Sequence, residues 1–159
     1  MTPAVEAARV AGVPFEVLEY PHDPGAEAYG IEAAEALHLD PAVVFKTLVV
    51  KLDGKTLAVG IVPVTARLDL KALASTLGAR KAEMAPPAEA ERATGYVLGG
   101  ISPIGQKRAL ASVLDASALL HATIHVSAGR RGAEIGLAPA DLVRLTGAQV
   151  AEIARDQPT

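Results

Sequence analysis

A glycine-rich stretch, residues 94–108, holds the first side chains and main-chain groups that could do chemistry. It contains Gly99, Gly100 and Gly105, with Ser102 among them. Glycine allows positive φ and lets a ligand approach the main chain closely. We therefore expect a loop that presents peptide N–H groups to a ligand, with a hydroxyl nearby. The frame is neither a Walker phosphate loop nor a GxGxxG dinucleotide fingerprint, and a tight turn with a bulge is the alternative.

A lysine within an apolar run is the second candidate. Lys46 lies in the strand-like residues 45–52, and alternation places it on the same face as Leu48 and Val50. Such a lysine either extends its ammonium group past the strand end or points into a pocket, and the sequence leaves both open. Glu134, between two apolar residues of a late strand, is equally open: it pairs with a lysine across the sheet, or it is solvated.

The remaining polar residues form none of the familiar catalytic or metal patterns. The four histidines fit no HExxH-type ligand set, so we expect neither a metal nor a cofactor. No serine lies in a GxSxG elbow. Ser102 and Ser127 adjoin glycine-containing loops, although a hydroxyl that bonds a turn backbone explains both. The absence of cysteine excludes disulfides, zinc–thiolate sites and a cysteine nucleophile.

The composition limits the class of protein. The chain has 159 residues, 50% of them hydrophobic, which fits one domain with a substantial core. Few aromatic residues argue against a broad stacking surface for single-stranded RNA. The net charge of −3 gives no overall attraction to nucleic acid, so the basic pairs at 80–81, 107–108 and 130–131 either contact a few phosphates or only aid solubility.

The elements that must position these residues are predicted from hydrophobic periodicity and turn signals. Strands are expected over residues 15–20, 45–52, 56–63, 81–85, 96–98, 111–114, 121–127 and 133–137. Helices are expected over residues 3–11, 31–39, 70–77, 88–93, 139–145 and 148–155, with a short helical turn after Asp40 and a turn cluster at 21–25. Asp53-Gly54 predicts a hairpin between the two clearest strands.

Strands outnumber helices in this prediction, and the early hairpin is antiparallel. We therefore expect an α+β fold, a single domain over residues 1–159, with a mixed, curled and barrel-like sheet flanked by helices. No apolar run approaches the roughly 18 residues that span a bilayer, and no signal peptide is recognised, which favours a cytoplasmic protein without membrane contact.

Several sequence blocks, taken in order, resemble those of one known family. The blocks are MTPAV, EYPHDP, VFKTLVV, LDLKALASTLGARK, TGYVLGGISPIGQK, VSAGRRG and LAPADL, and they cover essentially the whole chain. The sequence resembles the bacterial YbaK/EbsC aminoacyl-tRNA deacylases, and more narrowly the Cys-tRNA(Pro) deacylases, which are relatives of the editing domain of bacterial prolyl-tRNA synthetases. The resemblance implies hydrolysis of the ester that joins a mischarged amino acid to the tRNA 3′ end. Aminoacylated tRNA and prolyl-tRNA synthetase are the implied partners.

The resemblance also implies roles for single residues. Lys46 stands at the family's essential lysine, and Gly100 joins it as the second catalytic residue. The substrate-binding residues are expected to be Tyr20, Tyr29, Thr47, Gly99, Ile101, Ser102, Ser127 and Glu134. The chain departs from the family at Ala109 and Ala111, where a third basic residue and a proline are common.

An ester hydrolase without a cysteine, a triad or a metal must let the substrate or a water attack. In the family, the substrate cysteine's thiol is thought to attack its own ester carbonyl, while the protein supplies orientation and electrostatic stabilisation. Lys46 and the N–H groups of the glycine loop, residues 94–108, suit that task. Two alternatives remain: an Ala-tRNA(Pro) deacylase with an activated water, and a non-catalytic module that binds the aminoacylated 3′ end.

Overall fold

A long hairpin forms the centre of the fold in the computed structural model, which describes residues 1–23 and 29–156. Strands β2 (Phe45–Leu52) and β3 (Thr56–Pro63) pair antiparallel along their whole length, as predicted. Asp53 and Gly54 between them both have positive φ, 52° and 69°. Two successive residues with positive φ are typical of a tight hairpin turn, here closed by the Lys55 N–H, which donates to the Leu52 carbonyl at 2.9 Å. The register leaves residues 53–55 between the strands, and the hairpin that Asp-Gly predicted is confirmed.

Further strands extend the hairpin into a mixed five-stranded sheet of order β5–β2–β3–β6–β9. Strand β5 (Ala82–Met84) pairs antiparallel with β2. Strand β6 (Ala111–Asp115) pairs in parallel with β3, and β9 (Gln149–Ala151) pairs in parallel with β6. The predicted mixed character of the sheet is therefore confirmed.

Two smaller antiparallel sheets complete the strands. One has the order β1–β8–β7 and consists of β1 (Phe15–Glu19), β7 (Ile124–Ser127) and β8 (Ala133–Leu137). The other pairs β4 (Ala66–Leu68) with β10 (Ala154–Asp156). The strand pairings among the described residues form three separate sheets, so the expected barrel-like closure is not confirmed.

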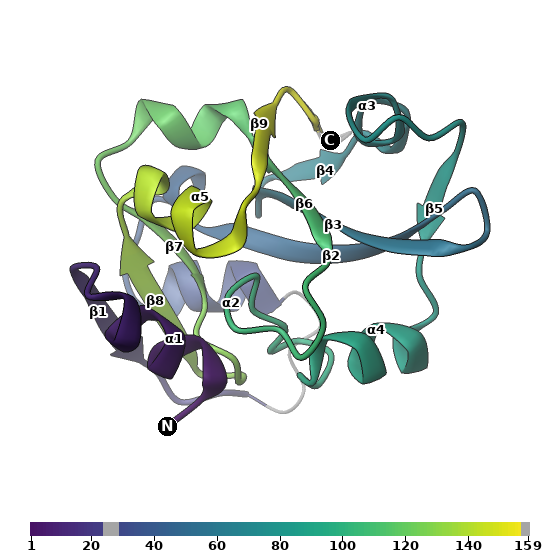
Figure 1. The fold of residues 1–159 in the computed structure, drawn as a ribbon. Helices are drawn as coiled ribbons and strands as arrows, with labels where there is room; N and C mark the ends of the chain where they lie inside the picture. The colour runs from purple at the N-terminus through teal and green to yellow at the C-terminus, as the bar shows by residue number, and fades with distance from the viewer. Residues whose placement is uncertain (24–28, 157–159) are drawn as a thin grey trace.

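The helices are short, and three of them, α1, α4 and α5, have a proline in the first turn and a left-handed glycine as C-cap. They are α1 (Pro3–Ala11), α2 (Tyr29–Ala36), α3 (Leu70–Thr76), α4 (Pro87–Thr94) and α5 (Pro139–Thr146), with 3₁₀ turns η1 (Pro41–Val43) and η2 (Ala116–Leu120). Asp69 caps α3 by accepting a hydrogen bond from the Ala72 N–H at 3.0 Å. Figure 1 shows α3 above and α4 below the β2–β3 hairpin. The helices therefore flank the sheet, as expected.

Two large hydrophobic clusters hold these layers together, beside a third, small one of Ala34, Val44 and Val64. The larger one lies between the five-stranded and the three-stranded sheets, where Val49 and Ile61 pack in one cluster with Val126 and Ile135. The smaller one lies on the opposite face of the hairpin, where the α3 residue Leu73 joins β2 and β3. The two faces of β2 and β3 thus enter different cores, as expected for an alternating strand covered on both sides.

Two of the predicted strands are wrong in whole or in part. Residues 96–98 form a loop, because α4 ends at the left-handed Gly95 (φ 81°), and Val97 and Leu98 are then 71% and 48% exposed. The strand predicted over 121–127 begins only at Ile124, because η2 extends to Leu120. The turn cluster predicted at 21–25 lies partly outside the described residues.

The second C-terminal helix, predicted over residues 148–155, is also wrong. Gly147 ends α5 in the left-handed conformation, and the chain then forms β9 and β10. The Asp115 carboxylate accepts hydrogen bonds from the Ile153 and Ala154 N–H groups at 2.9 and 3.0 Å. These tertiary hydrogen bonds override the helix propensity of an alanine-containing segment.

Candidate active site

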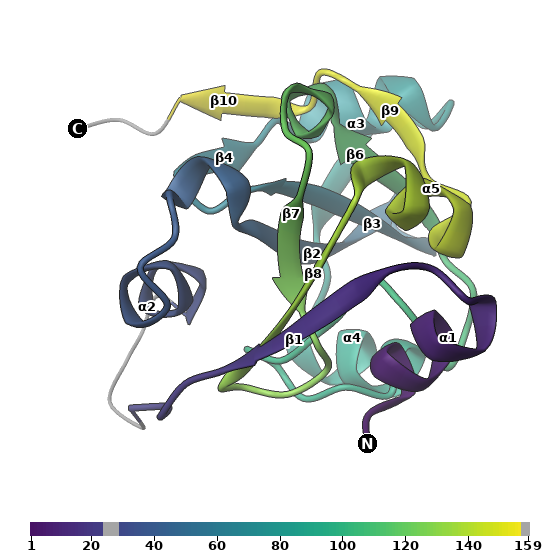
Figure 2. The same ribbon diagram turned by 90° about the vertical axis from the view of Figure 1, so that its left-hand side faces the viewer.

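One cavity, of about 530 Å³, gathers most of the residues predicted to act. It lies where the ends of β1, β2, β7 and β8 meet α2 and the glycine loop, and Figure 2 shows α2 standing apart from the sheets on this side. The lining residues are Tyr20, Tyr29, Gly30, Ile31, Phe45, Lys46, Thr47, Leu48, Val64, Thr65, Leu98, Gly99, Ile101, Ser127 and Glu134.

Lys46 at the start of β2 lines this cavity, so the second of its two sequence interpretations holds. Burial lowers the pKa of its ammonium group. No carboxylate within the described part of the chain forms an ion pair with it. The hydroxyl of Thr47, the next residue along β2, is buried and has no hydrogen-bond partner in the same part of the chain. Both groups are available to a ligand.

Glu134 on β8 is buried in the cavity wall, and both sequence interpretations of this residue are wrong. It is only 6% exposed, and it forms no ion pair with any lysine or arginine that the structure describes. Burial raises the pKa of its carboxyl to about 8. Burial, and next to it the charge of Glu134, raises the pKa of Tyr20 at the end of β1. A carboxyl with such a pKa is largely protonated near neutral pH and can donate a hydrogen bond.

The glycine loop forms another wall of the cavity and is closed at its base. The N–H groups of Lys107 and Arg108 donate to the carbonyls of Thr94 and Ala93 at 2.9 and 3.0 Å. The Tyr96 hydroxyl donates to the Ile104 carbonyl at 2.6 Å. These bonds hold the loop in a fixed shape without a strand ladder.

Within this loop, the peptide N–H groups are not all equivalent. The Gly100 N–H donates to the Val97 carbonyl at 2.8 Å and is therefore occupied. The N–H groups of Gly99 and Ile101 have no partner among the residues that the structure describes. Since Gly99 and Ile101 also line the cavity, a ligand bound there can approach both of these N–H groups.

Gly100 and Ser102 do not line the cavity. A Cβ at Gly100 would lie 2.8 Å from the Cα of Arg130, so protein backbone fills the space that the sequence reserved for a ligand. Ser102 is fully buried, and its hydroxyl accepts a hydrogen bond from the Ile104 N–H at 3.2 Å. The turn-bonding explanation therefore suffices for Ser102.

Ser127 differs from Ser102 because it combines both expectations. Its hydroxyl accepts a hydrogen bond from the Gly129 N–H at 3.1 Å, which is a turn-stabilising contact. The residue also lines the cavity, at the end of β7, where it lies opposite Glu134 of the neighbouring strand β8. It can therefore contact a ligand as well as support the turn.

Arg131 packs against two residues that line the cavity, although the sequence analysis considered it only as one of a basic pair. Its guanidinium carbon lies 4.0 Å from the centre of the Tyr29 ring, and its Nε and Nη2 atoms are buried without partners in the described chain. A Cβ at Gly99 would lie 2.9 Å from the Tyr29 ring and 3.1 Å from Arg131 Cδ. The glycines at 129 and 132, which flank the arginine pair, were the available signal.

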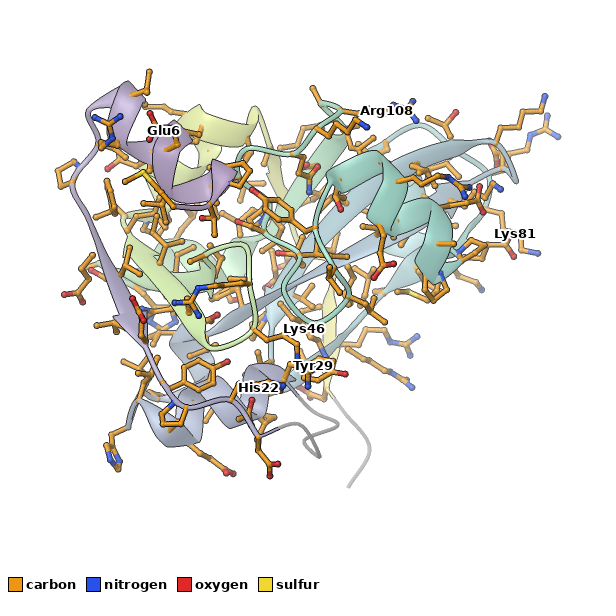
Figure 3. The ribbon with its side chains drawn as sticks, turned by 90° about the horizontal axis from the view of Figure 1, so that it is seen from below. Glu6, His22, Tyr29, Lys46, Lys81 and Arg108 are labelled. Atoms are coloured by element: carbon orange, nitrogen blue, oxygen red, sulfur yellow. The ribbon has the colours of Figure 1, made fainter. Side chains whose placement is uncertain are left out.

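A second pair steadies the Tyr29 side of the cavity. His22 Nδ1 lies 3.1 Å from the Glu32 carboxylate, and the His22 and Tyr29 rings meet edge to face at 6.4 Å. Figure 3 shows His22, Tyr29 and Lys46 close together beside α2. Lys46 and Glu134 thus face one cavity without neutralising each other, an arrangement typical of functional sites.

The arrangement offers a cation, a protonated carboxyl, a free hydroxyl and two free peptide donors. These groups can stabilise a developing oxyanion and donate a proton to a leaving oxygen. Within residues 1–23 and 29–156, no three histidine, aspartate or glutamate side chains gather as a metal site. No helix in this part of the chain is long and apolar enough to cross a membrane.

Comparisons with known proteins agree on one family. The family model described as an aminoacyl-tRNA editing domain matches residues 23–145. A provisionally named Cys-tRNA(Pro)/Cys-tRNA(Cys) deacylase, EbsC of Enterococcus faecalis, is 42% identical over 120 residues, which are 76% of this chain and 73% of the relative.

Two solved structures extend the likeness to the whole chain. A provisionally assigned trans-editing enzyme for prolyl-tRNA synthetase is 28% identical, with a TM-score of 0.78 over 98% of this chain and 99% of that chain. A hypothetical protein is 24% identical, with a TM-score of 0.85 over 97% of this chain and 100% of that chain, and it shows the likeness of fold.

Proposed function

Because this chain belongs to the aminoacyl-tRNA editing domain family and is an aminoacyl-tRNA deacylase, we propose that its substrate is Cys-tRNA(Pro). The observation that carries the proposal is the cavity that holds Lys46 and Glu134 unpaired. The names of the Enterococcus relative and of the trans-editing enzyme support the choice of cysteine and of a proline tRNA.

The cavity suits the end of a charged tRNA in size and in chemistry. A volume of about 530 Å³ lies within the usual range for small-molecule pockets and is sufficient for a terminal adenosine carrying a small amino acid. Its walls mix apolar side chains, such as Leu48 and Val64, with the few polar groups described above. Such a site encloses the ester and excludes much of the water around it.

In the proposed reaction, the thiol of the substrate cysteine attacks its own ester carbonyl. A sulfur–carbon bond forms, the carbon–oxygen bond to the ribose breaks, and the thiol proton ends on the ribose oxygen. The products are a four-membered thiolactone, which water opens to cysteine, and a free tRNA 3′ end. Tight orientation is essential, because the ring is strained.

Each protein group has a place in this scheme. The Lys46 ammonium group and the free N–H groups of Gly99 and Ile101 stabilise the oxyanion on the carbonyl oxygen. The protonated carboxyl of Glu134 relays this proton: it gives its own proton to the ribose oxygen as that oxygen leaves, and it takes up the thiol's proton in its place. Tyr20, Tyr29, Thr47 and Ser127 orient the aminoacyl group. Gly100 and Ser102 support the loop from behind.

Single-turnover deacylation of Cys-, S-methyl-Cys-, Ser- and Ala-tRNA(Pro) tests the proposal. We expect fast release from Cys-tRNA(Pro) and none from the S-methyl substrate, although the latter still binds. Rapid hydrolysis of the S-methyl or alanyl substrate would show that an activated water, and not the substrate thiol, attacks the ester. Binding without hydrolysis of any substrate would indicate a module that only holds the 3′ end.

We further propose that a prolyl-tRNA synthetase delivers the mischarged tRNA, since a relative of similar fold is named for that enzyme. Added synthetase should then raise the deacylation rate at limiting tRNA. An unchanged rate would mean that the chain selects the tRNA by itself.

A further inference from the structure

A second hollow, of about 250 Å³, lies beside α4 at the base of the glycine loop. It is smaller than the cavity and far more polar in its side chains. The residues that line it are Leu57, Glu89, Arg92, Ala93, Lys107 and Arg108.

The side chains that line this hollow carry three positive charges and one negative charge. The one carboxylate among the lining residues, that of Glu89, already forms an ion pair with the Lys51 ammonium group at 2.9 Å. Arg92, Lys107 and Arg108 are exposed, and none forms an ion pair with a carboxylate in the described residues. Three uncompensated cations therefore meet at one place on a chain whose net charge is −3.

The hollow and the cavity share the glycine loop. Leu98 lines the cavity, and the three peptide units from Leu98 back to Gly95 span at most about 11 Å. A Cβ at Gly95 would lie 3.3 Å from the Cβ of Lys107 in the hollow. Lys107 therefore lies within about 16 Å of the cavity wall. Figure 3 shows Arg108 at this end of the loop, apart from Lys46 and Tyr29.

We propose that this hollow binds the phosphodiester backbone of the RNA strand whose aminoacylated 3′ end occupies the cavity. The inference rests on the proposed function. A stacked strand rises about 3.4 Å per nucleotide, so a strand of at most about five nucleotides bridges the two places. Arginine and lysine are suited to phosphate oxygens, and contacts of this kind fix the position of an RNA without reading its sequence.

Glutamine substitutions at Arg92, Lys107 and Arg108, singly and together, test the inference. The measurement is binding of an uncharged acceptor-stem hairpin with a free 3′ strand, at several salt concentrations. Each single change should weaken binding about fivefold at physiological salt, the scale of one lost phosphate contact. The triple variant should also reduce the slope of log K against log[salt] by about 2 to 3.

A matched triple variant with glutamine at Lys55, Lys71 and Arg80 removes the same number of exposed cations elsewhere on the chain. It should bind the hairpin nearly as well as the unchanged protein. Equal losses in both triple variants would overturn the inference, because the effect would then be one of net charge. Unchanged binding and an unchanged slope in the Arg92, Lys107 and Arg108 triple variant would overturn it as well.

Kinetics separates this inference from the proposed function. The triple variant should raise KM for Cys-tRNA(Pro) and leave hydrolysis of cysteinyl-adenosine, which lacks the strand, unchanged. Loss of cysteinyl-adenosine hydrolysis would overturn the inference. Absence of all hydrolysis in the wild-type protein would refute the proposed function. The RNA-binding assay alone would then test whether the hollow binds the RNA backbone. Loss of synthetase binding with intact RNA binding would make the hollow a protein interface and overturn it too.

Discussion

The cavity and the basic hollow both contain charged side chains beside the glycine loop, but they differ in how far these side chains are exposed to water. In the cavity, Glu134 is buried and Lys46 is partly buried, and burial shifts the pKa of each so that its neutral form is favoured. In the hollow, Arg92, Lys107 and Arg108 stay exposed. A desolvated charge acts strongly over a short range, whereas an exposed charge acts weakly and is screened by salt. Substitutions should therefore change rate and pH dependence in the cavity, and affinity in the hollow.

The largest effect is expected at Lys46. Lys46→Ala should lower the single-turnover rate for Cys-tRNA(Pro) by about 10²-fold or more, the scale of losing one preorganised electrostatic group. Because the unpaired ammonium group is partly desolvated in the folded protein, its removal should not lower the melting temperature. Lys71→Ala, on the exposed side of α3, is the matched control and should be neutral. Near-normal turnover in a folded Lys46→Ala variant would remove Lys46 from the chemistry.

The next largest effect on the rate is expected at Glu134, and the protonation of its carboxyl predicts how the rate depends on pH. With the pKa of its carboxyl at about 8, the donor form prevails below that pH. The rate should therefore fall as pH rises through about 8. Glu134→Gln keeps an N–H donor and should lose about tenfold in rate while losing this pH dependence. A rate that instead rises with pH through 8, and is lost in the glutamine variant, would make the ionised carboxylate the active form.

The same group also makes the stability of the protein depend on pH. The pKa of Glu134 is raised from 4.5 to about 8 by burial, so the folded state holds this proton more tightly than the unfolded state. Stability is then full below about 4.5 and declines as pH rises toward 8. Glu134→Gln removes the decline and should be more stable at pH 8 by about 1 to 2 kcal/mol, the shift being discounted for the open cavity. Melting curves of both proteins from pH 4 to 9 measure the difference.

A substitution at Gly100 should lower stability while leaving the rate of the folded protein nearly unchanged. In Gly100→Ala, the added Cβ would meet the Arg130 backbone at 2.8 Å, so the loop must shift and stability should drop by about 1 to 3 kcal/mol. The folded fraction should keep its rate within several-fold, because the Gly100 N–H bonds Val97 and not the substrate. Thermal melting together with active-site-normalised rates tests this. A stable but inactive Gly100→Ala protein would return Gly100 to the ligand's side of the loop.

Local signals in the sequence account for the parts of the fold that depend on neighbouring residues. Asp53-Gly54 specifies its hairpin, and Asp69 specifies the start of α3, because turn and cap preferences operate over a few residues. Residues 148–155 could not be predicted in the same way, since their conformation depends on N–H groups that donate to the Asp115 carboxylate, far away in the chain. A pattern of apolar residues does not reveal such a distant carboxylate.

The site shows the same division. Lys46 was detectable because a lysine interrupts an apolar strand. The state of Glu134 was not, because its burial results from β1 and β7 on either side of β8, whose pairing no local pattern reveals. Arg131 resembled an ordinary surface arginine until α2 brought Tyr29 over its guanidinium group. Desolvation is a property of the assembled fold, and it determines which charged residues act.

The smallest expected effects belong to the two serines, which form a matched pair across the cavity boundary. Both hydroxyls accept a turn N–H, at 3.2 Å for Ser102 and 3.1 Å for Ser127, but only Ser127 lines the cavity. Ser102→Ala should therefore lower stability by about 1 kcal/mol and leave the rate unchanged. Ser127→Ala should lower stability by a similar amount and also reduce the rate, by less than about tenfold, since its hydroxyl orients the substrate.

Single-turnover rates and melting temperatures of both serine variants, measured side by side, make the test. Equal rates in the two variants would mean that the cavity wall at Ser127 does not contact the substrate. Complete loss of activity in a folded Ser127→Ala protein would be incompatible with attack by the substrate thiol, because only a nucleophile or its direct activator has so large an effect. The two hydroxyls each accept one turn N–H, so a difference in rate between the two variants arises from the contact of Ser127 with the cavity.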